Sequence, residues 1–234
     1  MKRLIAVGAV VACAVGMVLS TGPARAQEEQ PEKPGECTRN YSNVTMYGSK
    51  VVPGGATCYL YNVVLVGGID VRPGGSLYVD SGGTSSHPSN VGPINVNAGT
   101  LYVDDSTTKA ISVNRPTEGP IGDGLAVRIC GSTVSSVSVT YTPGPSGVSI
   151  GGRECEPEEE CQECEFLTSQ YNEGGNHILG DLKIVYNNAF VDAEDNVIDG
   201  GVSCWYNNPA PYFRYNTVKG MVTGQCVTTV KQGG

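Results

Sequence analysis

Three sets of residues recur at intervals of twenty near the C-terminal end of this chain, and they constrain its fold more than any other feature. Coincident repeats of one length indicate a short structural unit, laid down several times so that each copy packs on the next. The sequence therefore predicts a solenoid. The sets are the apolar Ile178, Ile198 and Val218, the glycines Gly180, Gly200 and Gly220, and the apolar Leu182, Val202 and Val222.

Alternation within each copy gives the type of unit. The apolar residues Ile178, Leu182 and Ile184, and then Ile198, Val202 and Cys204, alternate with polar ones, which is the period of a strand rather than a helix. Earlier, Val51-Val-Pro-Gly-Gly55 recurs as Val71-Arg-Pro-Gly-Gly75, and Pro-Gly-Gly between apolar runs marks a repeated corner. Strand-and-corner units of this length are typical of a β-helix. We predict an all-β, right-handed parallel β-helix of about eight coils.

The first 26 residues are typical of a signal peptide. Lys2 and Arg3 precede an apolar run from Leu4 to Leu19, and Ala24-Arg25-Ala26 fits a small-x-small cleavage site. An alternative is a lipoprotein, because the residues before Cys13 resemble a lipobox. Either interpretation predicts an exported protein, secreted or held at the bacterial cell surface.

The rest of the chain divides into four parts. Residues 27–43 form an acidic, proline-containing linker and lead-in, and coils are expected over 44–152 and again over 177–230. Residues 153–176 are rich in glutamate and cysteine and have no apolar period. We expect this segment to be either a disulfide-tied side loop or a flexible bridge between two halves of the solenoid.

Charge narrows the range of partners. Without the three basic residues of the signal peptide, 12 basic residues remain against 23 acidic ones. A surface this acidic repels nucleic acid and anionic lipid. Beyond the signal peptide, no apolar run approaches the roughly 20 residues needed to span a bilayer. We expect no nucleic-acid partner and no membrane span, and the oligomeric state stays open.

Eight cysteines remain after signal-peptide removal, and an even number in an exported chain favours disulfides. We favour a bond between Cys37 and Cys58, which would fix the lead-in to the first coil. Cys204 and Cys226 are separated by 22 residues rather than twenty, so their pairing would require the last coil to bend. The eight are Cys37, Cys58, Cys130, Cys155, Cys161, Cys164, Cys204 and Cys226.

Two alternatives concern the cysteines of the acidic segment. Cys155, Cys161 and Cys164 followed by His177 offer four Zn²⁺ ligands, and Cys161-Gln-Glu-Cys164 has the spacing of a redox pair. Neighbouring glutamates raise thiol pKa values, and the spacing matches no common zinc finger. Disulfides are therefore the preferred prediction.

A candidate binding surface follows from strand alternation. If Leu77 and Val79 point inward, then Tyr78 points outward, and stacking of coils places it in a column with Tyr59 and Tyr102. Such a strip suits sugar rings or a protein partner. The alternative is that these tyrosines are only structural and are covered by a loop.

Carboxylates lie beside this column. Asp80 and Asp104 are expected on adjacent coils with Asp105 close by, where they would hold Ca²⁺ or act as an acid and base pair. Ca²⁺ is the only cofactor that this arrangement suggests. We assign Asp80 and Asp104, with the three tyrosines, to the candidate binding site and name no catalytic residue.

The repeats from Val51 to Cys58 and from Gly67 to Leu77 resemble those of small exported right-handed β-helix proteins of actinobacteria, for which the resemblance implies no established activity. Pectate lyases and polygalacturonases share this architecture. Asp104-Asp105 is similar to the paired aspartates of polygalacturonases, but the accompanying Gly-His-Gly and Arg-x-Lys motifs are absent from this sequence.

The predicted function is therefore that of an exported, non-enzymatic β-helix, structural or binding, whose partner is a cell-wall or extracellular polysaccharide or a surface protein. A polysaccharide lyase or hydrolase is the first alternative. The second is a self-associating surface scaffold, since an open solenoid end exposes unpaired strand edges.

Overall fold

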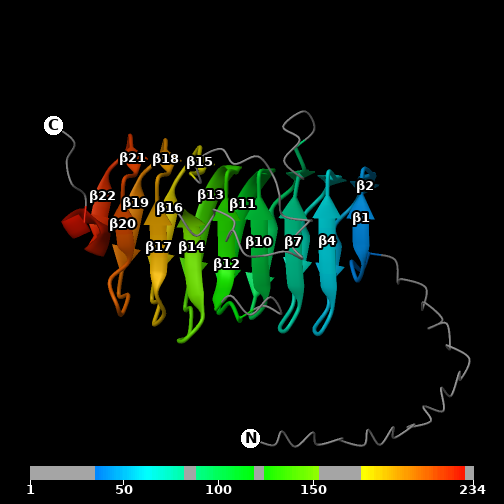
Figure 1. Ribbon diagram of the computed structural model, residues 1–234, viewed down its shortest axis with the longest axis horizontal. Helices are drawn as coiled ribbons and strands as arrows, with labels where there is room; N and C mark the ends of the chain where they lie inside the picture. Colours follow the sequence, from blue (N-terminus) through cyan, green and yellow to red (C-terminus); the bar gives the residue numbers. More distant parts are fainter. Residues whose placement is uncertain (1–34, 82–87, 119–123, 153–174, 230–234) are drawn as a thin grey trace, which may run out of the picture. The chain divides into compact units, whose positions relative to one another are not determined.

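The computed structural model describes residues 35–81, 88–118, 124–152 and 175–229, within one compact unit, Glu32–Gly234. The predicted signal peptide and residues 27–34 of the predicted linker and lead-in lie outside the described residues. Figure 1 shows strands running side by side in a stack, from β1 near the start of the unit to β20 and β22 near its end. The chain is all-β apart from one short 3-10 helix in the part described.

One parallel sheet, here called the front sheet, has eight strands among the described residues and takes one strand from each coil. Its strands pair in register with the equivalent strand of the coils before and after. In order they are β1 (Asn40–Ser42), β4 (Thr57–Tyr61), β7 (Ser76–Asp80), β10 (Thr100–Asp104), β12 (Leu125–Cys130), β14 (Gly147–Gly151), β17 (Val191–Glu194) and β20 (Tyr212–Arg214).

A second parallel sheet, the back sheet, has fourteen strands within the described ranges and forms two rows that merge at its two longest strands. The first row is β2 (Thr45–Tyr47), β5 (Val64–Val66), β8 (Asn90–Val91), β11 (Thr107–Asn114), β13 (Thr133–Thr140), β15 (His177–Ile178), β18 (Val197–Ile198) and β21 (Thr217–Val218). The second row adds β3 (Lys50–Val52), β6 (Ile69–Val71), β9 (Ile94–Asn97), β16 (Leu182–Val185), β19 (Val202–Trp205) and β22 (Val222–Gly224).

This topology is a parallel β-helix of eight coils, which confirms the predicted fold class. The boundaries differ at both ends. The first strand begins at Asn40, inside the predicted lead-in, and residues Gln225–Thr229 form the 3-10 helix η2 rather than part of a coil.

The acidic cysteine-rich segment is inserted into a single coil. Strands on its two sides pair directly, with Thr133 opposite His177 and Val148 opposite Val191. The solenoid therefore continues in register across the insertion, so the prediction of a bridge between separate halves is wrong. Residues 153–174 themselves lie outside the described part of the chain.

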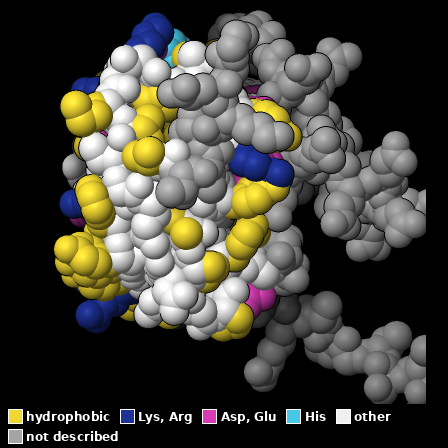
Figure 2. All heavy atoms as spheres, turned by 90° about the vertical axis from the view of Figure 1, so that its left-hand side faces the viewer, with side chains coloured by type: hydrophobic (Ala, Val, Ile, Leu, Met, Phe, Trp, Pro, Cys, Tyr) yellow, Lys and Arg dark blue, Asp and Glu magenta, His cyan; other side chains and the backbone are white. Residues whose placement is uncertain are grey.

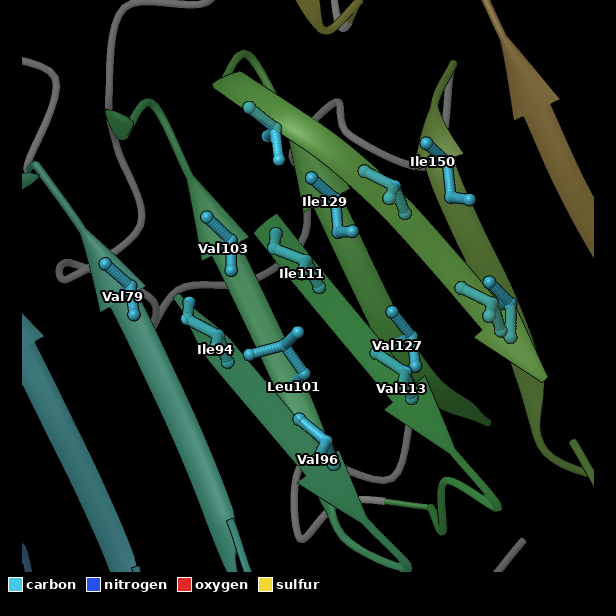
Figure 3. Close-up of a cluster of buried hydrophobic side chains, with 14 of the residues drawn as sticks. Val79, Ile94, Val96, Leu101, Val103, Ile111, Val113, Val127, Ile129 and Ile150 are labelled. Atoms are coloured by element: carbon cyan, nitrogen blue, oxygen red, sulfur yellow. The ribbon is translucent and has the colours of Figure 1, made fainter. Parts of the chain in front are cut away.

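The core consists of columns of aliphatic side chains, one from each coil. In the front sheet, Val79, Val103, Ile129 and Ile150 follow one another in register and are all fully buried. Figure 3 shows them with side chains from the back sheet pointing into the space between the sheets. Each such side chain contributes about 1.5–3 kcal/mol through burial, so the stack is stabilised mainly by these columns.

The glycine repeat has a steric cause. A Cβ at Gly200 would lie 2.4 Å from the carbonyl carbon of Gly180, and one at Gly220 would lie 2.4 Å from the oxygen of Gly200. The backbone nitrogen of each glycine bonds to the oxygen of the one before, at 3.1 and 3.0 Å. The glycines therefore recur every twenty residues because they occupy a corner where the backbones of successive coils are in contact.

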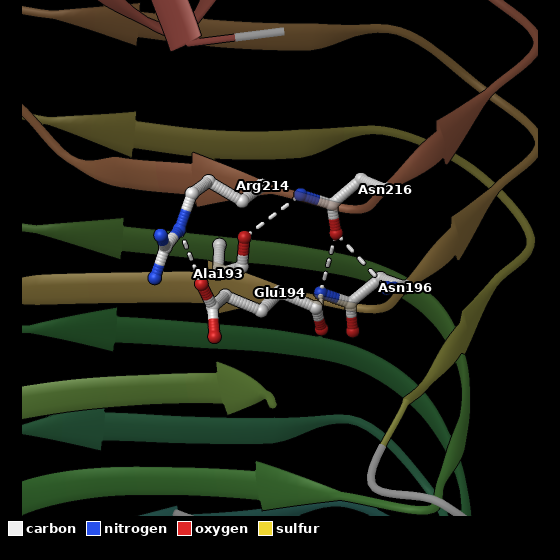
Figure 4. Close-up of polar contacts among 5 residues, drawn as sticks. All are labelled: Ala193, Glu194, Asn196, Arg214 and Asn216. Atoms are coloured by element: carbon white, nitrogen blue, oxygen red, sulfur yellow. Dashed lines mark hydrogen bonds and ion pairs between the residues drawn. The ribbon is translucent and has the colours of Figure 1, made fainter. Parts of the chain in front are cut away.

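Two ladders of buried amides fill the other corners of the last coils. Asn176, Asn196 and Asn216 form the first, in which the side-chain oxygen of each later asparagine accepts from the backbone and side-chain nitrogens of the one before. Figure 4 shows the bonds from Asn196 to Asn216 and from Asn216 to the carbonyl of Ala193. Buried polar groups in these corners are thus paired from coil to coil.

The second ladder lies at the corner that follows the back sheet. The Oδ1 of Asn187 accepts from the backbone nitrogen of Thr142, at 2.9 Å. The Oδ1 of Asn207 accepts from the side-chain amide of Asn187, also at 2.9 Å, and the Oε1 of Gln225 accepts from Asn207 at 3.1 Å. Tyr186-Asn187-Asn188 recurs as Tyr206-Asn207-Asn208, and this ladder explains the repeat, because the first asparagine of each copy points into the corner.

Disulfides close both ends of the described stack. Cys37 bonds to Cys58, as predicted, and Cys204 bonds to Cys226. The second bond forms because Gly224 adopts a φ of 74° and the chain turns into η2, which packs against β19, β20 and β22. None of the described helices has the length and apolar character needed to cross a membrane.

Candidate functional site

The predicted tyrosine column exists on the outer surface of the front sheet. Tyr59, Tyr78 and Tyr102 are paired in register, and their rings stack with centroids 4.6 and 4.9 Å apart. Tyr78 and Tyr102 are only 7% and 8% exposed, however, and the Tyr102 hydroxyl donates to the carbonyl of Leu125 at 3.3 Å. A binding role for the column stays a prediction, and Tyr59 is its one exposed ring.

The predicted carboxylates lie beside the column. Asp80 ends β7 and Asp104 ends β10, at equivalent positions, and Asp105 follows at a corner with a φ of 42°. Burial and the nearby Asp105 raise the pKa of Asp104 to about 7, against a smaller opposing effect of Arg128. Asp104 can therefore hold or release a proton near neutral pH.

The geometry lends the predicted metal sites no support. Among the described residues, no three His, Cys, Asp or Glu side chains lie close enough together to hold a metal ion. The zinc alternative rests on Cys155, Cys161 and Cys164, which lie outside the described residues. His177 instead contacts Asp199, with Nε2 and Oδ2 3.1 Å apart, and Asp199 also pairs with Lys219 at 2.8 Å.

Cys130 lies next to the carboxylates, opposite Asp104 in the front sheet. It is disulfide-bonded, whereas the other four cysteines of the described residues pair with one another. Its partner is therefore a cysteine outside the described part of the chain.

A second acidic pair lies further along the same face. Asp192 and Glu194 are both buried, although they alternate with the inward-facing residues of β17. The Nε of Arg214 bonds to the Oε1 of Glu194 at 2.7 Å, as Figure 4 shows, and the guanidinium carbon of Arg214 lies 3.3 Å from the ring centroid of Tyr212. This pairing compensates the burial of Glu194.

A different set of tyrosines is open to solvent. Tyr141, Tyr186 and Tyr206, here called the exposed tyrosine ladder, follow β13, β16 and β19 at one corner of the back sheet. Their rings stack with centroids 5.1 and 4.8 Å apart and interplanar angles of 6° and 9°. They are 49%, 44% and 68% exposed.

The backbone holds these rings in place. Each tyrosine adopts a φ between 57° and 59°, in the left-handed region, at the point where the chain turns from the strand into the corner. Asn187 and Asn207, which follow Tyr186 and Tyr206, belong to the second amide ladder, and Thr142, which follows Tyr141, donates its backbone N–H to Asn187. The ladder of amides inside the corner therefore fixes the ladder of rings outside it.

A row of uncharged polar side chains leads up to the exposed tyrosine ladder along the same edge of the back sheet, and within this row only Thr140 lies on a coil that carries one of the tyrosines. Asn97, Asn114 and Thr140 are in register on successive coils, and they are linked by side-chain hydrogen bonds of 3.2 and 3.4 Å. Val185 and Trp205 continue this row beside the later tyrosines. Along this edge the surface thus passes from polar groups on the earlier coils to aromatic rings on the later ones.

Exposed apolar side chains of the last coils stand in separate groups on the visible part of the C-terminal face (Figure 2). Figure 2 looks onto the C-terminal end of the stack and shows hydrophobic side chains in several separate groups, with lysine or arginine beside some of them. The large exposed apolar residues of this region include Trp205, Tyr206, Tyr215, Met221 and Val227.

Sequence reasoning identified the buried column and missed the exposed one. A signal was present, because Tyr186 and Tyr206 are twenty residues apart within the repeated motif. Tyr141 had no such signal, since the inserted segment separates it from Tyr186 by 45 residues.

Comparisons with known proteins do not assign a function. No protein-family model, curated protein or solved structure matches this chain. A function for this chain therefore has to be inferred from its fold and its surface geometry.

Proposed function

We propose that this protein is an exported, non-enzymatic β-helix that binds glycan or a surface protein at or outside the cell surface. The observation that carries the proposal is the exposed tyrosine ladder. Rigid aromatic side chains that are already ordered lose little conformational entropy on binding, and they are enriched where proteins bind partners. Tyr141, Tyr186 and Tyr206 meet this description because stacking and the amide ladder order them without a ligand.

Export agrees with the covalent structure. The bonds Cys37–Cys58 and Cys204–Cys226 are typical of a protein that matures in an oxidising compartment. The signal-peptide pattern and the resemblance to exported actinobacterial β-helix proteins lead to the same proposal.

The test is a binding assay with the 27–234 chain, bacterial cell walls and a panel of plant and bacterial polysaccharides, measuring bound protein in the pellet. We expect retention by at least one preparation and a loss of about tenfold or more in the Tyr186→Ala/Tyr206→Ala double variant. Tyr47→Ala is the matched control, because Tyr47 is also exposed but lies in β2, far along the stack. Equal loss in the control would contradict the assignment of the site.

A hydrolytic activity is the second candidate, and one observation favours it. Asp104 has a pKa of about 7, and Asp80 and Asp105 lie close enough to raise it, which is the property of a general acid in a carboxylate pair. The supernatants of the same assay should be examined for released reducing ends. Release by the native chain that disappears in Asp104→Asn would favour the enzyme over the binding protein.

A further inference from the structure

We propose that the exposed tyrosine ladder binds a neutral, linear polysaccharide lengthwise along the coils, through ring edges and phenol hydroxyls rather than through ring faces. This inference rests on the proposed binding function and specifies its ligand and its mode of contact.

The stacking of the rings determines which atoms a ligand reaches. Tyr186 lies between Tyr141 and Tyr206, with near-parallel planes at 6° and 9°, so both of its faces are covered by neighbouring rings. It is nevertheless 44% exposed, and with a ring stacked on each side a ligand reaches it mainly at its edge and hydroxyl. A sugar ring that needs a bare aromatic face finds one only at the ends of the ladder.

The bordering row supplies further hydrogen-bonding groups. Asn97, Asn114 and Thr140 each present an amide or hydroxyl on the successive coils that lead up to Tyr141, along the same edge of the back sheet. A polymer that repeats its hydroxyl groups along its length can contact one coil after another. Each neutral hydrogen bond is individually weak, so affinity should depend on how many coils the polymer covers.

Charge selects the class of polymer. The chain carries a formal net charge of −8, which repels polyanions at long range. Locally, Arg115 occupies the same corner one coil before Tyr141, and the exposed Lys183 lies on β16 before Tyr186, so a polycation is also disfavoured. A neutral polysaccharide avoids both penalties.

The experiment measures the affinity of the 27–234 chain for soluble mixed-linkage β-glucan, for cello-oligosaccharides of increasing length and for polygalacturonate as the anionic comparison. We expect binding to the neutral β-glucan, rising affinity with oligosaccharide length, and weaker binding to polygalacturonate. Tyr186→Phe keeps the ring stack and removes one hydroxyl, so it should weaken β-glucan binding by about threefold to tenfold. Tyr47→Phe should bind as the native chain does, and thermal unfolding should show that both variants fold.

The outcomes separate this inference from the proposed function. Native binding to β-glucan that is unchanged in Tyr186→Phe but lost in Tyr206→Ala would overturn the edge mode in favour of stacking on the terminal ring. Preferential binding to polygalacturonate would overturn the neutral ligand class. A native chain that binds no polysaccharide and no cell-wall preparation would overturn the proposed function itself.

Discussion

The side-chain amide of Asn196 donates to the Oδ1 of Asn216, 2.9 Å away and one coil further along the stack. The same amide group donates to the carbonyl of Ile150 at 2.8 Å, inside the corner. The Oδ1 of Asn196 accepts from the side-chain amide of Asn176 at 2.9 Å. One buried side chain thus joins three coils, and it sets the distance between them at the corner.

Asn196→Ala should therefore be strongly destabilising. It removes these bonds and leaves the carbonyl of Ile150 and the amide of Asn176 without this partner in a buried corner, at a cost of roughly 2–4 kcal/mol in the free energy of unfolding. Urea unfolding monitored by circular dichroism measures the change. Asn95→Ala is the control, because Asn95 bonds to Asp70 at an exposed site, and its loss should cost less than about 0.5 kcal/mol. Similar costs in the two variants would contradict a structural role for the ladder.

The fold of this chain could be predicted from its sequence because the spacing of the repeats follows from the geometry of the backbone. Gly180, Gly200 and Gly220 recur at intervals of twenty since any larger side chain would meet the backbone of the preceding coil. The first amide ladder shares this spacing, because Asn176, Asn196 and Asn216 are also twenty apart.

The candidate site was harder to predict from the sequence, because alternation shows which side of a sheet a residue occupies but not what covers that side. Tyr78 and Tyr102 point outward as predicted and are buried all the same. The bond between Cys204 and Cys226 was left open for a related reason. Their separation of 22 residues breaks the register of the coils, and only the turn into η2 brings the two together.

Gly200→Ala tests the steric explanation of the glycine repeat. The added Cβ would stand 2.4–2.5 Å from the backbone of Gly180, so that two coils would have to separate, and we expect a loss of about 1–3 kcal/mol in the free energy of unfolding. Gly201→Ala is a matched control one residue away, where the nearest atom, the oxygen of Met221, would be 3.1 Å from the Cβ. Chemical denaturation of both variants gives the comparison, and an equal or larger loss for Gly201→Ala would refute the explanation.

Asp104 should make stability fall as pH rises. Burial and Asp105 raise the pKa of its carboxyl from 3.8 to about 7 in the folded chain, whereas the unfolded chain keeps the ordinary value. Between these two pH values the folded state retains a proton that the unfolded state has lost, so the free energy of unfolding decreases from about pH 4 to about pH 7 and then levels off.

Asp104→Asn should remove this decrease, because the amide does not titrate. At pH 8 the variant should be more stable than the native chain by up to about 4 kcal/mol, and at pH 4 the two should be nearly equal. Thermal unfolding across this pH range provides the measurement. The exposed Asp70→Asn serves as the control, and a native stability that does not change between pH 4 and pH 7 would rule out a buried, protonated Asp104.

Cys130 should be joined to the acidic segment. Cys37–Cys58 and Cys204–Cys226 use four of the eight mature cysteines, and Cys130 is bonded, so we predict that its partner is Cys155, Cys161 or Cys164. Mass spectrometry of a non-reduced digest should find the peptide containing Cys130 linked to one from residues 153–174. Cys130→Ser should then expose one alkylatable thiol in a monomer, whereas a free Cys130 in the native chain, or a link between two chains, would disprove this pairing. Because Cys130 lies opposite Asp104, the predicted bond would anchor the inserted segment beside the carboxylates of the front sheet.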